Sequence, residues 1–135
     1  MSSARETRGR LHVKYGRGGL VDVEFLGAGA PARPRASDQP DVRRFTTTAA
    51  LHGLARAGAL EQATAAGLVD RYRLLRRISA ALRLLGARPS DTLELAGPMP
   101  ARVATALGYE SRQAFLDAYR ENATAVRAAY EEVTG

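Results

Sequence analysis

The sequence contains no cysteine, no tryptophan and a single lysine among its 135 residues. Without cysteine, the chain cannot form a disulfide, use a thiolate nucleophile or build a metal site that needs sulfur. Its two histidines, His12 and His52, are forty positions apart, so a histidine-rich metal site is not expected. No apolar run approaches the roughly 20 residues of a membrane-spanning helix, and the polar N-terminus lacks the apolar core of a signal peptide. These absences are typical of a cytoplasmic protein with one hydrophobic core.

The chain is basic, with 20 basic residues against 14 acidic ones and a formal net charge of +6. The excess is concentrated at the N-terminus, because residues 1–45 carry a net charge of +4 and residues 46–135 a net charge of +2. Such a bias favours a polyanionic partner such as nucleic acid, nucleotide phosphates or an acidic protein surface, although a solvated basic surface gives the same composition. No aromatic pair alternates with a basic run, so recognition of nucleic acid by base stacking is not expected.

Glycine and proline divide the chain into four segments. We expect a disordered tail over residues 1–10, a motif segment over residues 11–26, a linker rich in proline and glycine over residues 27–45, and a helical bundle over residues 46–135. Within the motif segment, residues 20–26 fit either a strand or a short helix, and the pattern leaves both open. The predicted fold is a single, mainly α domain of about four to five helices with a short N-terminal strand and glycine turn.

The strongest periodic signal lies in residues 61–85. Apolar residues recur there every three or four positions and predict one buried helical stripe of Leu68, Tyr72, Leu75, Ile78, Leu82 and Leu85. Three further helices are expected: from Thr46 or Thr47 to Ala57, from Pro100 to just before Gly108, and from a Ser111 cap to the C-terminus. Gly58 and Gly86 each suit the position just past a helix.

Residues 14–25, with the sequence KYGRGGLVDVEF, form the most informative motif. A helix that begins after the glycines would point its free N–H groups at the turn, where they and the two basic side chains would form an anion site. The carboxylates could then hold a divalent metal beside a phosphate. A tight turn with solvated charges explains the same residues, and the spacing matches neither a P-loop nor a GxGxxG fingerprint. The candidate phosphate- or nucleotide-binding residues are Lys14, Arg17, Gly18 and Gly19, and the candidate carboxylates are Asp22 and Glu24.

A second candidate site is a basic patch of Arg73, Arg76 and Arg77 on the long predicted helix. Arg73 and Arg77 are one turn apart and share a face. The patch would contact a nucleotide, RNA or an acidic partner, or it is simply a solvated helix face. No spacing in the chain suggests a serine–histidine–aspartate constellation, so no catalytic residue is assigned.

The motif at residues 14–25 resembles the K-x-x-x-G-G-[LI]-x-D-[IV]-E-F signature of glutamine synthetase adenylyltransferases. The whole chain is similar to the helical domain that follows each nucleotidyltransferase domain in those enzymes and in relatives that uridylylate PII signal proteins. The similarity continues in the same order through residues 46–51, 57–60, 72–78, 91–93 and 107–109, and covers about residues 11–133. The positions that match the signature are Lys14, Gly18, Gly19, Leu20, Asp22, Val23, Glu24 and Phe25.

The resemblance implies adenylyl transfer from ATP to a tyrosine of glutamine synthetase, and its reversal by phosphorolysis. In that family, aspartates of a G-S-x-x-D-x-D motif hold magnesium ions in the nucleotidyltransferase domain, as phosphoryl-type transfer requires. This chain contains neither a Gly-Ser pair nor an Asp-x-Asp pair. We therefore expect no metal or cofactor in this chain alone, and assign ATP and Mg²⁺ to the full-length family.

The sequence also departs from the family pattern outside the catalytic motif. Gly27 and Ala28 stand where the family has Val-Gln, and Ser79, Ala81 and Arg83 replace the glutamate, arginine and glutamine of its L-R-R-L-E-x-R-L-Q helix. These changes remove polar groups that could pair with Arg76 or Arg77 within the domain.

Three hypotheses follow, in decreasing order of preference. The chain is a non-catalytic interaction or regulatory module in the control of nitrogen metabolism, binding glutamine synthetase, a PII-type protein or a separate nucleotidyltransferase domain. Alternatively, it is the nucleotide-binding part of an adenylyltransferase that acts with a separate catalytic domain. The least favoured hypothesis is a nucleic-acid binder, for which affinity should fall steeply with salt.

Overall fold

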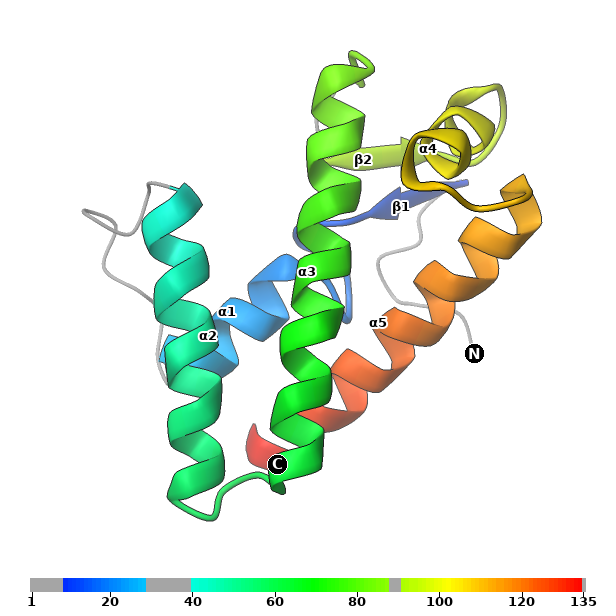
Figure 1. The fold of residues 1–135 in the computed structure, drawn as a ribbon. Coiled ribbons are helices and arrows are strands. Elements are labelled where there is room, and N and C mark those ends of the chain that lie inside the picture. The colour runs from blue at the N-terminus through cyan, green and yellow to red at the C-terminus, as the bar shows by residue number, and fades with distance from the viewer. Residues whose placement is uncertain (1–8, 29–39, 88–90, 135) are drawn as a thin grey trace.

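The computed structural model describes residues 9–28, 40–87 and 91–134 (Figure 1). In these ranges the chain is mainly helical, as the sequence predicts, and it has one small sheet. Its elements in chain order are β1 (Arg10–His12), α1 (Leu20–Ala28), α2 (Pro40–Arg56), α3 (Gln62–Leu84), β2 (Thr92–Glu94), α4 (Met99–Leu107) and α5 (Arg112–Thr134). None of the helices in the described ranges has the length and apolar character needed to cross a membrane.

Helix α3 is the central element of the fold (Figure 1). Its predicted apolar stripe is confirmed from Leu68 to Leu82, where all five predicted residues are buried, whereas Leu85 is the C-cap and is only half-buried. Helices α1, α2, α4 and α5 all pack against it. The helix ends where the glycine pattern predicts, since Gly86 has a φ of +82° and its N–H donates to the carbonyl of Arg83 at 3.2 Å.

Helices α4 and α5 also follow their local signals. Pro100 lies in the first turn of α4, and Gly108 ends that helix with a φ of +88°. The Ser111 hydroxyl accepts a hydrogen bond from the Ala114 N–H at 3.0 Å, which is the predicted N-cap of α5.

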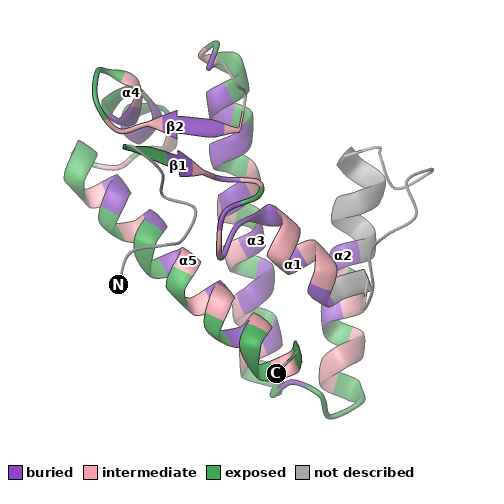
Figure 2. Ribbon diagram, turned by 180° about the vertical axis from the view of Figure 1, so that it is seen from behind, coloured by how far each residue is buried: buried purple, intermediate pink, exposed green. Residues whose placement is uncertain are grey.

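Strands β1 and β2 form an antiparallel ribbon that joins the N-terminal segment to the connection between α3 and α4. Leu11 lies opposite Leu93, and both side chains are buried in the core. Both strands carry buried residues in Figure 2. The Val13 N–H extends the pairing by donating to the Asp91 carbonyl at 2.9 Å. The sequence predicted the first strand but not the second, which is only three residues long and depends on its distant partner.

The open choice at residues 20–26 is decided in favour of a helix. Leu20, Val23 and Leu26, at helical spacing, are buried on one face of α1. Helix α1 packs against α2, α3 and α5, so the motif segment belongs to the same core as the bundle.

Two expected boundaries differ from the structure. Arg10, expected in the disordered tail, pairs with Glu94 in the ribbon. Within the expected linker over residues 27–45, α1 continues to Ala28 and α2 begins at Pro40, because proline fits the first turn of a helix as well as it breaks the interior. The remaining parts of those two segments, residues 1–8 and 29–39, lie outside the described residues.

Candidate functional site

The glycine motif forms a closed turn between β1 and α1. The Leu20 N–H donates to the Val13 carbonyl at 3.0 Å, and the Val21 N–H donates to the Lys14 carbonyl at 2.9 Å. The Gly19 N–H donates to the Gly16 carbonyl at 2.9 Å. These N–H groups were expected to bind an anion, but in this structure they donate to backbone carbonyls of residues 13–16.

Gly18 and Gly19 are required by close packing. Gly18 has a φ of +75°, and a Cβ at this position would collide with the backbone of Ala123 in α5. A Cβ on Gly19 would collide with the carbonyl oxygen of Val13. The two glycines therefore let the turn lie directly against α5 and against the end of β1.

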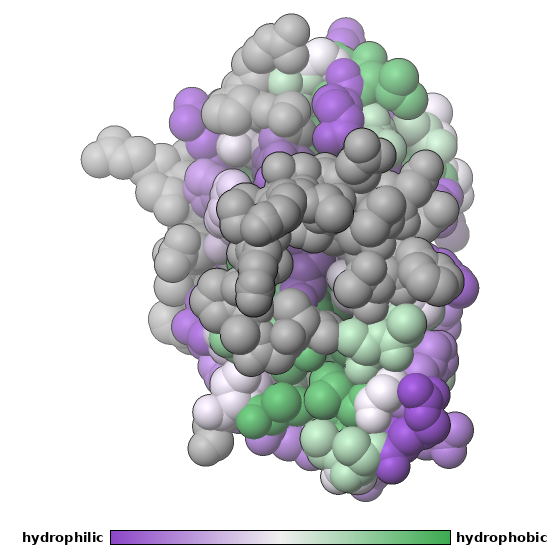
Figure 3. All heavy atoms as spheres, turned by 90° about the vertical axis from the view of Figure 1, so that its left-hand side faces the viewer, coloured by the Kyte–Doolittle hydropathy of each residue, from purple (hydrophilic) through white to green (hydrophobic). Residues whose placement is uncertain are grey.

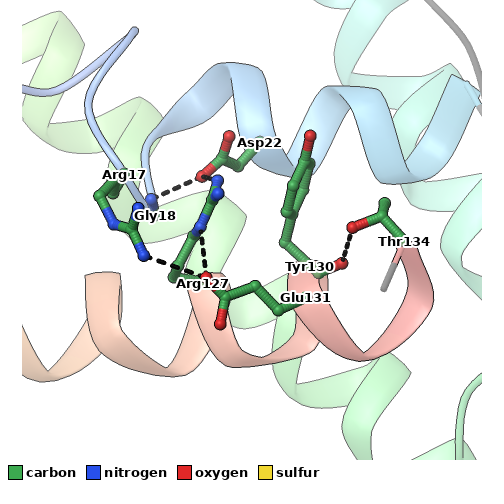
Figure 4. Close-up of polar contacts among 7 residues, drawn as sticks. All are labelled: Arg17, Gly18, Asp22, Arg127, Tyr130, Glu131 and Thr134. Carbon is green, nitrogen blue, oxygen red and sulfur yellow. Dashed lines mark hydrogen bonds and ion pairs between the residues drawn. The ribbon is translucent and has the colours of Figure 1, made fainter. Parts of the chain in front are cut away.

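Asp22 connects the turn to α5. Its Oδ2 accepts the Gly18 N–H at 2.7 Å and an N–H from Arg127 at 3.1 Å (Figure 4). Both side chains are largely removed from solvent, with exposed fractions of 14% for Asp22 and 26% for Arg127. Burial by itself lowers the pKa of Arg127, but hydrogen bonds to Asp22 and to Glu131 outweigh burial and raise that pKa above its ordinary value.

Arg127 and its neighbours extend this contact along α5. Arg17 and Arg127 both donate to Oε2 of Glu131, at 3.0 and 3.1 Å (Figure 4). The Arg127 guanidinium also stacks over the Tyr130 ring at 4.4 Å from its centre, and Tyr130 in turn packs against Phe25 of α1. We call Arg17, Asp22, Arg127 and Glu131 the α1–α5 clamp.

Glu24 faces a different helix from Asp22. The Tyr72 hydroxyl in α3 donates to Oε2 of Glu24 at 2.9 Å. Burial and the negative charge of Glu24 raise the pKa of Tyr72 above its ordinary value, against the opposing effect of a hydrogen bond with Thr47 of α2. Tyr72 therefore joins α1, α2 and α3, and the two motif carboxylates do not converge on one point.

The described residues do not fit a resident magnesium site. Nowhere in the described ranges do three or more histidine, cysteine, aspartate or glutamate residues group as metal ligands would. Asp22 and Glu24 each accept hydrogen bonds from groups of the chain itself. Binding of nucleotide or metal by the motif residues stays a prediction.

Lys14 and Tyr15 contact each other at the start of the motif. The Lys14 ammonium lies 5.3 Å from the centre of the Tyr15 ring, and Tyr15 is 63% exposed. Among the described residues, Lys14 has no ion pair.

The basic patch lies on α3, apart from the motif. Arg73 is ion-paired to Asp70 at 3.2 Å on the solvent side of the helix. Arg76 lies over the Tyr72 ring at 5.7 Å, and Arg77 donates to the Leu107 carbonyl of α4 at 3.5 Å.

Sequence reasoning missed the α5 half of the clamp. Arg127 and Glu131 are one turn apart on α5, a common helix-surface pair, so nothing local marks them as partners of a motif 105 residues earlier. The packing of the turn against Ala123 and of α1 against α5 brings them to Asp22.

The fold and the motif define a class of protein: a helical domain in which a glycine-rich turn and helix α1 are held between α3 and α5. Comparison with known proteins identifies the family of the chain. The family described as GlnD PII-uridylyltransferase matches residues 2–134. This chain belongs to that family, as the resemblance in its motif implies.

Three relatives illustrate the similarity; all are named bifunctional glutamine synthetase adenylyltransferase/adenylyl-removing enzyme. The protein of Xanthomonas campestris pv. campestris (strain ATCC 33913) is 32% identical over 121 residues, which cover 90% of this chain and 13% of that protein. The protein of Nocardia farcinica is 32% identical, over 92% of this chain and 12% of its own length. The protein of Streptomyces avermitilis is 34% identical, over 98% of this chain and 14% of its own length.

The chain thus spans about an eighth of the length of these relatives, and is an adenylyltransferase-related domain. No solved structure matches it.

Proposed function

We propose that this chain is a non-catalytic, partner-binding module of the adenylyltransferase family that acts in the control of nitrogen metabolism in the cytoplasm. Its partners would be glutamine synthetase, a PII-type protein or a separate nucleotidyltransferase domain. The names of the relatives support the first of these partners, since they act on glutamine synthetase.

The proposal rests on which groups the two motif carboxylates contact. Phosphoryl-type transfer needs carboxylates that converge on metal ions beside the transferred group. Here Asp22 faces α5 and Glu24 faces α3, and each is bound to a group of the protein. The sequence adds that the chain contains no Asp-x-Asp pair. Both facts favour a scaffold and docking role over catalysis.

The test combines binding with activity. Native mass spectrometry of the full chain with glutamine synthetase, a PII-type protein and a nucleotidyltransferase domain, all from Streptomyces avermitilis, should show a complex with at least one of them. The chain alone, given ATP and Mg²⁺, should leave glutamine synthetase unmodified. No complex with any of the three, or adenylylation by the purified chain alone, would overturn the proposal.

A second candidate function is nucleotide binding in support of a separate catalytic domain. Lys14 favours it, because this motif cation has no ion pair among the described residues and lies beside the exposed Tyr15 ring. A nucleotide at about a hundred times its Kd would stabilise the fold by about 2.7 kcal/mol. Thermal unfolding with and without Mg-ATP should then show a shift that Lys14→Ala abolishes and Arg102→Ala, at an exposed arginine of α4, retains. An unshifted wild-type transition at millimolar Mg-ATP rejects this function.

A further inference from the structure

The C-terminal half of α3 carries a largely exposed arginine face. At 3.6 residues per turn, Arg73, Arg76, Arg77, Ala80, Arg83 and Leu84 fall within an arc of about 120°, opposite the buried stripe of the same helix. Leu84 is 88% exposed, which is unusual for a leucine in a folded domain. We call these six residues the α3 arginine face.

Five of these six residues are exposed, and Arg76 is half-buried beside the Tyr72 ring. Helix α3 extends beyond α2, and β2 and α4 flank only one side of its upper end (Figure 1). Seen from the side of α2, strongly hydrophilic and strongly hydrophobic side chains lie next to each other at that end of the molecule (Figure 3).

The charges on the face are poorly neutralised. Within the described ranges, Asp70 is the carboxylate that pairs with it, through Arg73, and that pair is solvent-exposed on both sides. Arg76 contacts the Tyr72 ring and Arg77 contacts the Leu107 carbonyl, so both are positioned by uncharged groups that leave their charge available.

We infer that the α3 arginine face docks an acidic amphipathic helix of a partner protein, with carboxylates on the arginines and an apolar side chain on Leu84. The face extends from Arg73 to Leu84, about 16 Å or three helical turns at 1.5 Å per residue. Guanidinium groups bind carboxylates in paired geometry, and an exposed leucine at the end of the row gives an apolar anchor.

Nucleic acid fits this face less well. Single-stranded nucleic acid is held by aromatic side chains on which bases stack. In the described ranges, the α3 arginine face presents no exposed aromatic ring, and the exposed Tyr15 lies in the turn before α1. An apolar anchor such as Leu84 serves a protein partner.

The inference rests on the proposed function, since it names the surface that a partner would use, but it can be tested separately. The probe is a fluorescein-labelled helical peptide of about 20 residues, with glutamates on one face and a leucine one turn beyond them. A peptide with glutamine for glutamate and a uridine oligonucleotide serve as comparisons. Fluorescence anisotropy with the full chain measures affinity at low and high salt.

The decisive variants reverse the same number of charges, and each pair includes one arginine in the last turn of a helix. Arg77→Glu with Arg83→Glu reverses two charges on the face, and Arg56→Glu with Arg102→Glu reverses two exposed charges elsewhere. Arg83 and Arg56 are each in the last turn of their helix, so both pairs place one glutamate at a helix C-terminus. Circular dichroism confirms that each variant is folded.

We expect the first pair to weaken binding of the glutamate peptide at least about tenfold and the second pair to change it less than about twofold. Leu84→Ala should weaken it severalfold, and high salt should abolish it. Failure of the glutamate peptide to bind, equal losses in both pairs, or tighter α3-dependent binding of the oligonucleotide would overturn the inference.

The outcomes separate the two proposals. A nitrogen-control partner that binds the Arg77→Glu/Arg83→Glu variant as well as wild type leaves the proposed function standing and rejects this surface. Peptide binding that depends on the α3 arginine face, without a complex with any of those partners, supports this surface and rejects the proposed function.

Discussion

Gly18 is the residue on which the attachment of the motif to α5 depends most directly. It combines a left-handed backbone with close approach to the Ala123 backbone, and only the absence of a side chain satisfies both. Gly18→Ala should therefore lower the free energy of unfolding by about 2–5 kcal/mol, from roughly 1–2 for the backbone and 1–3 for overpacking. Urea denaturation measures the loss.

The control for this prediction is Gly58→Ala. Gly58 has a φ of +84°, but a Cβ added there would meet no atom within 4 Å, so only the backbone cost applies. Equal losses for the two variants would contradict close packing as the reason for Gly18.

Asp22 tests the α1–α5 clamp at the level of one side chain. Asp22→Ala leaves Nη1 of Arg127 and the Gly18 N–H without their shared acceptor, in a part-buried environment, while Nε of Arg127 keeps Glu131. We expect a loss of about 1–3 kcal/mol in unfolding free energy, measured by urea denaturation. Asp70→Ala removes the exposed pair with Arg73 and should cost less than about 1 kcal/mol. A smaller loss for Asp22→Ala than for Asp70→Ala would argue against the clamp.

Tyr72 should make the stability of the fold depend on pH in the alkaline range. Its pKa is raised in the folded state, chiefly by burial, from an ordinary value of 10.0. Below pH 10 both states hold the proton and stability is unaffected; above it, the unfolded state ionises first, so stability falls as pH rises. Tyr72→Phe should flatten this fall, although it loses the hydrogen bond to Glu24 at every pH. The measurement is the urea midpoint of wild type and Tyr72→Phe between pH 9 and 11. An equal fall of the midpoint with pH in both proteins would contradict the role of Tyr72. Tyr15→Phe, at an exposed tyrosine, is the control.

At the scale of elements, helix starts and ends follow local chemistry. The Ser111 cap is an example, because it was expected from sequence and is present at 3.0 Å from the Ala114 N–H. Ser111→Ala should lower stability by about 0.5–2 kcal/mol in thermal or urea unfolding, and Ser111→Asp should retain it. Equal destabilisation by both substitutions would mean that the cap does not account for the effect.

At the scale of the whole molecule, the elements share one core. Helix α1 contacts α2, α3 and α5, and the β1–β2 ribbon buries Leu11 and Leu93 in the same cluster. We therefore expect one cooperative unfolding transition, with coincident curves for helical circular dichroism and tyrosine fluorescence. Leu93→Ala should shift both curves together by about 2–5 kcal/mol, and separated curves would show that the ribbon unfolds independently.

Local sequence patterns predicted the helical class, the apolar stripe of α3, the glycine ends of α3 and α4, and the cap of α5, because each depends on residues close together in the chain. They also marked residues 14–25 as the informative motif. The tertiary structure alone decided that residues 20–26 are a helix, that β2 exists, and that Asp22 and Glu24 face α5 and α3. Those outcomes depend on contacts between residues about 50 to 105 positions apart, which no local pattern encodes.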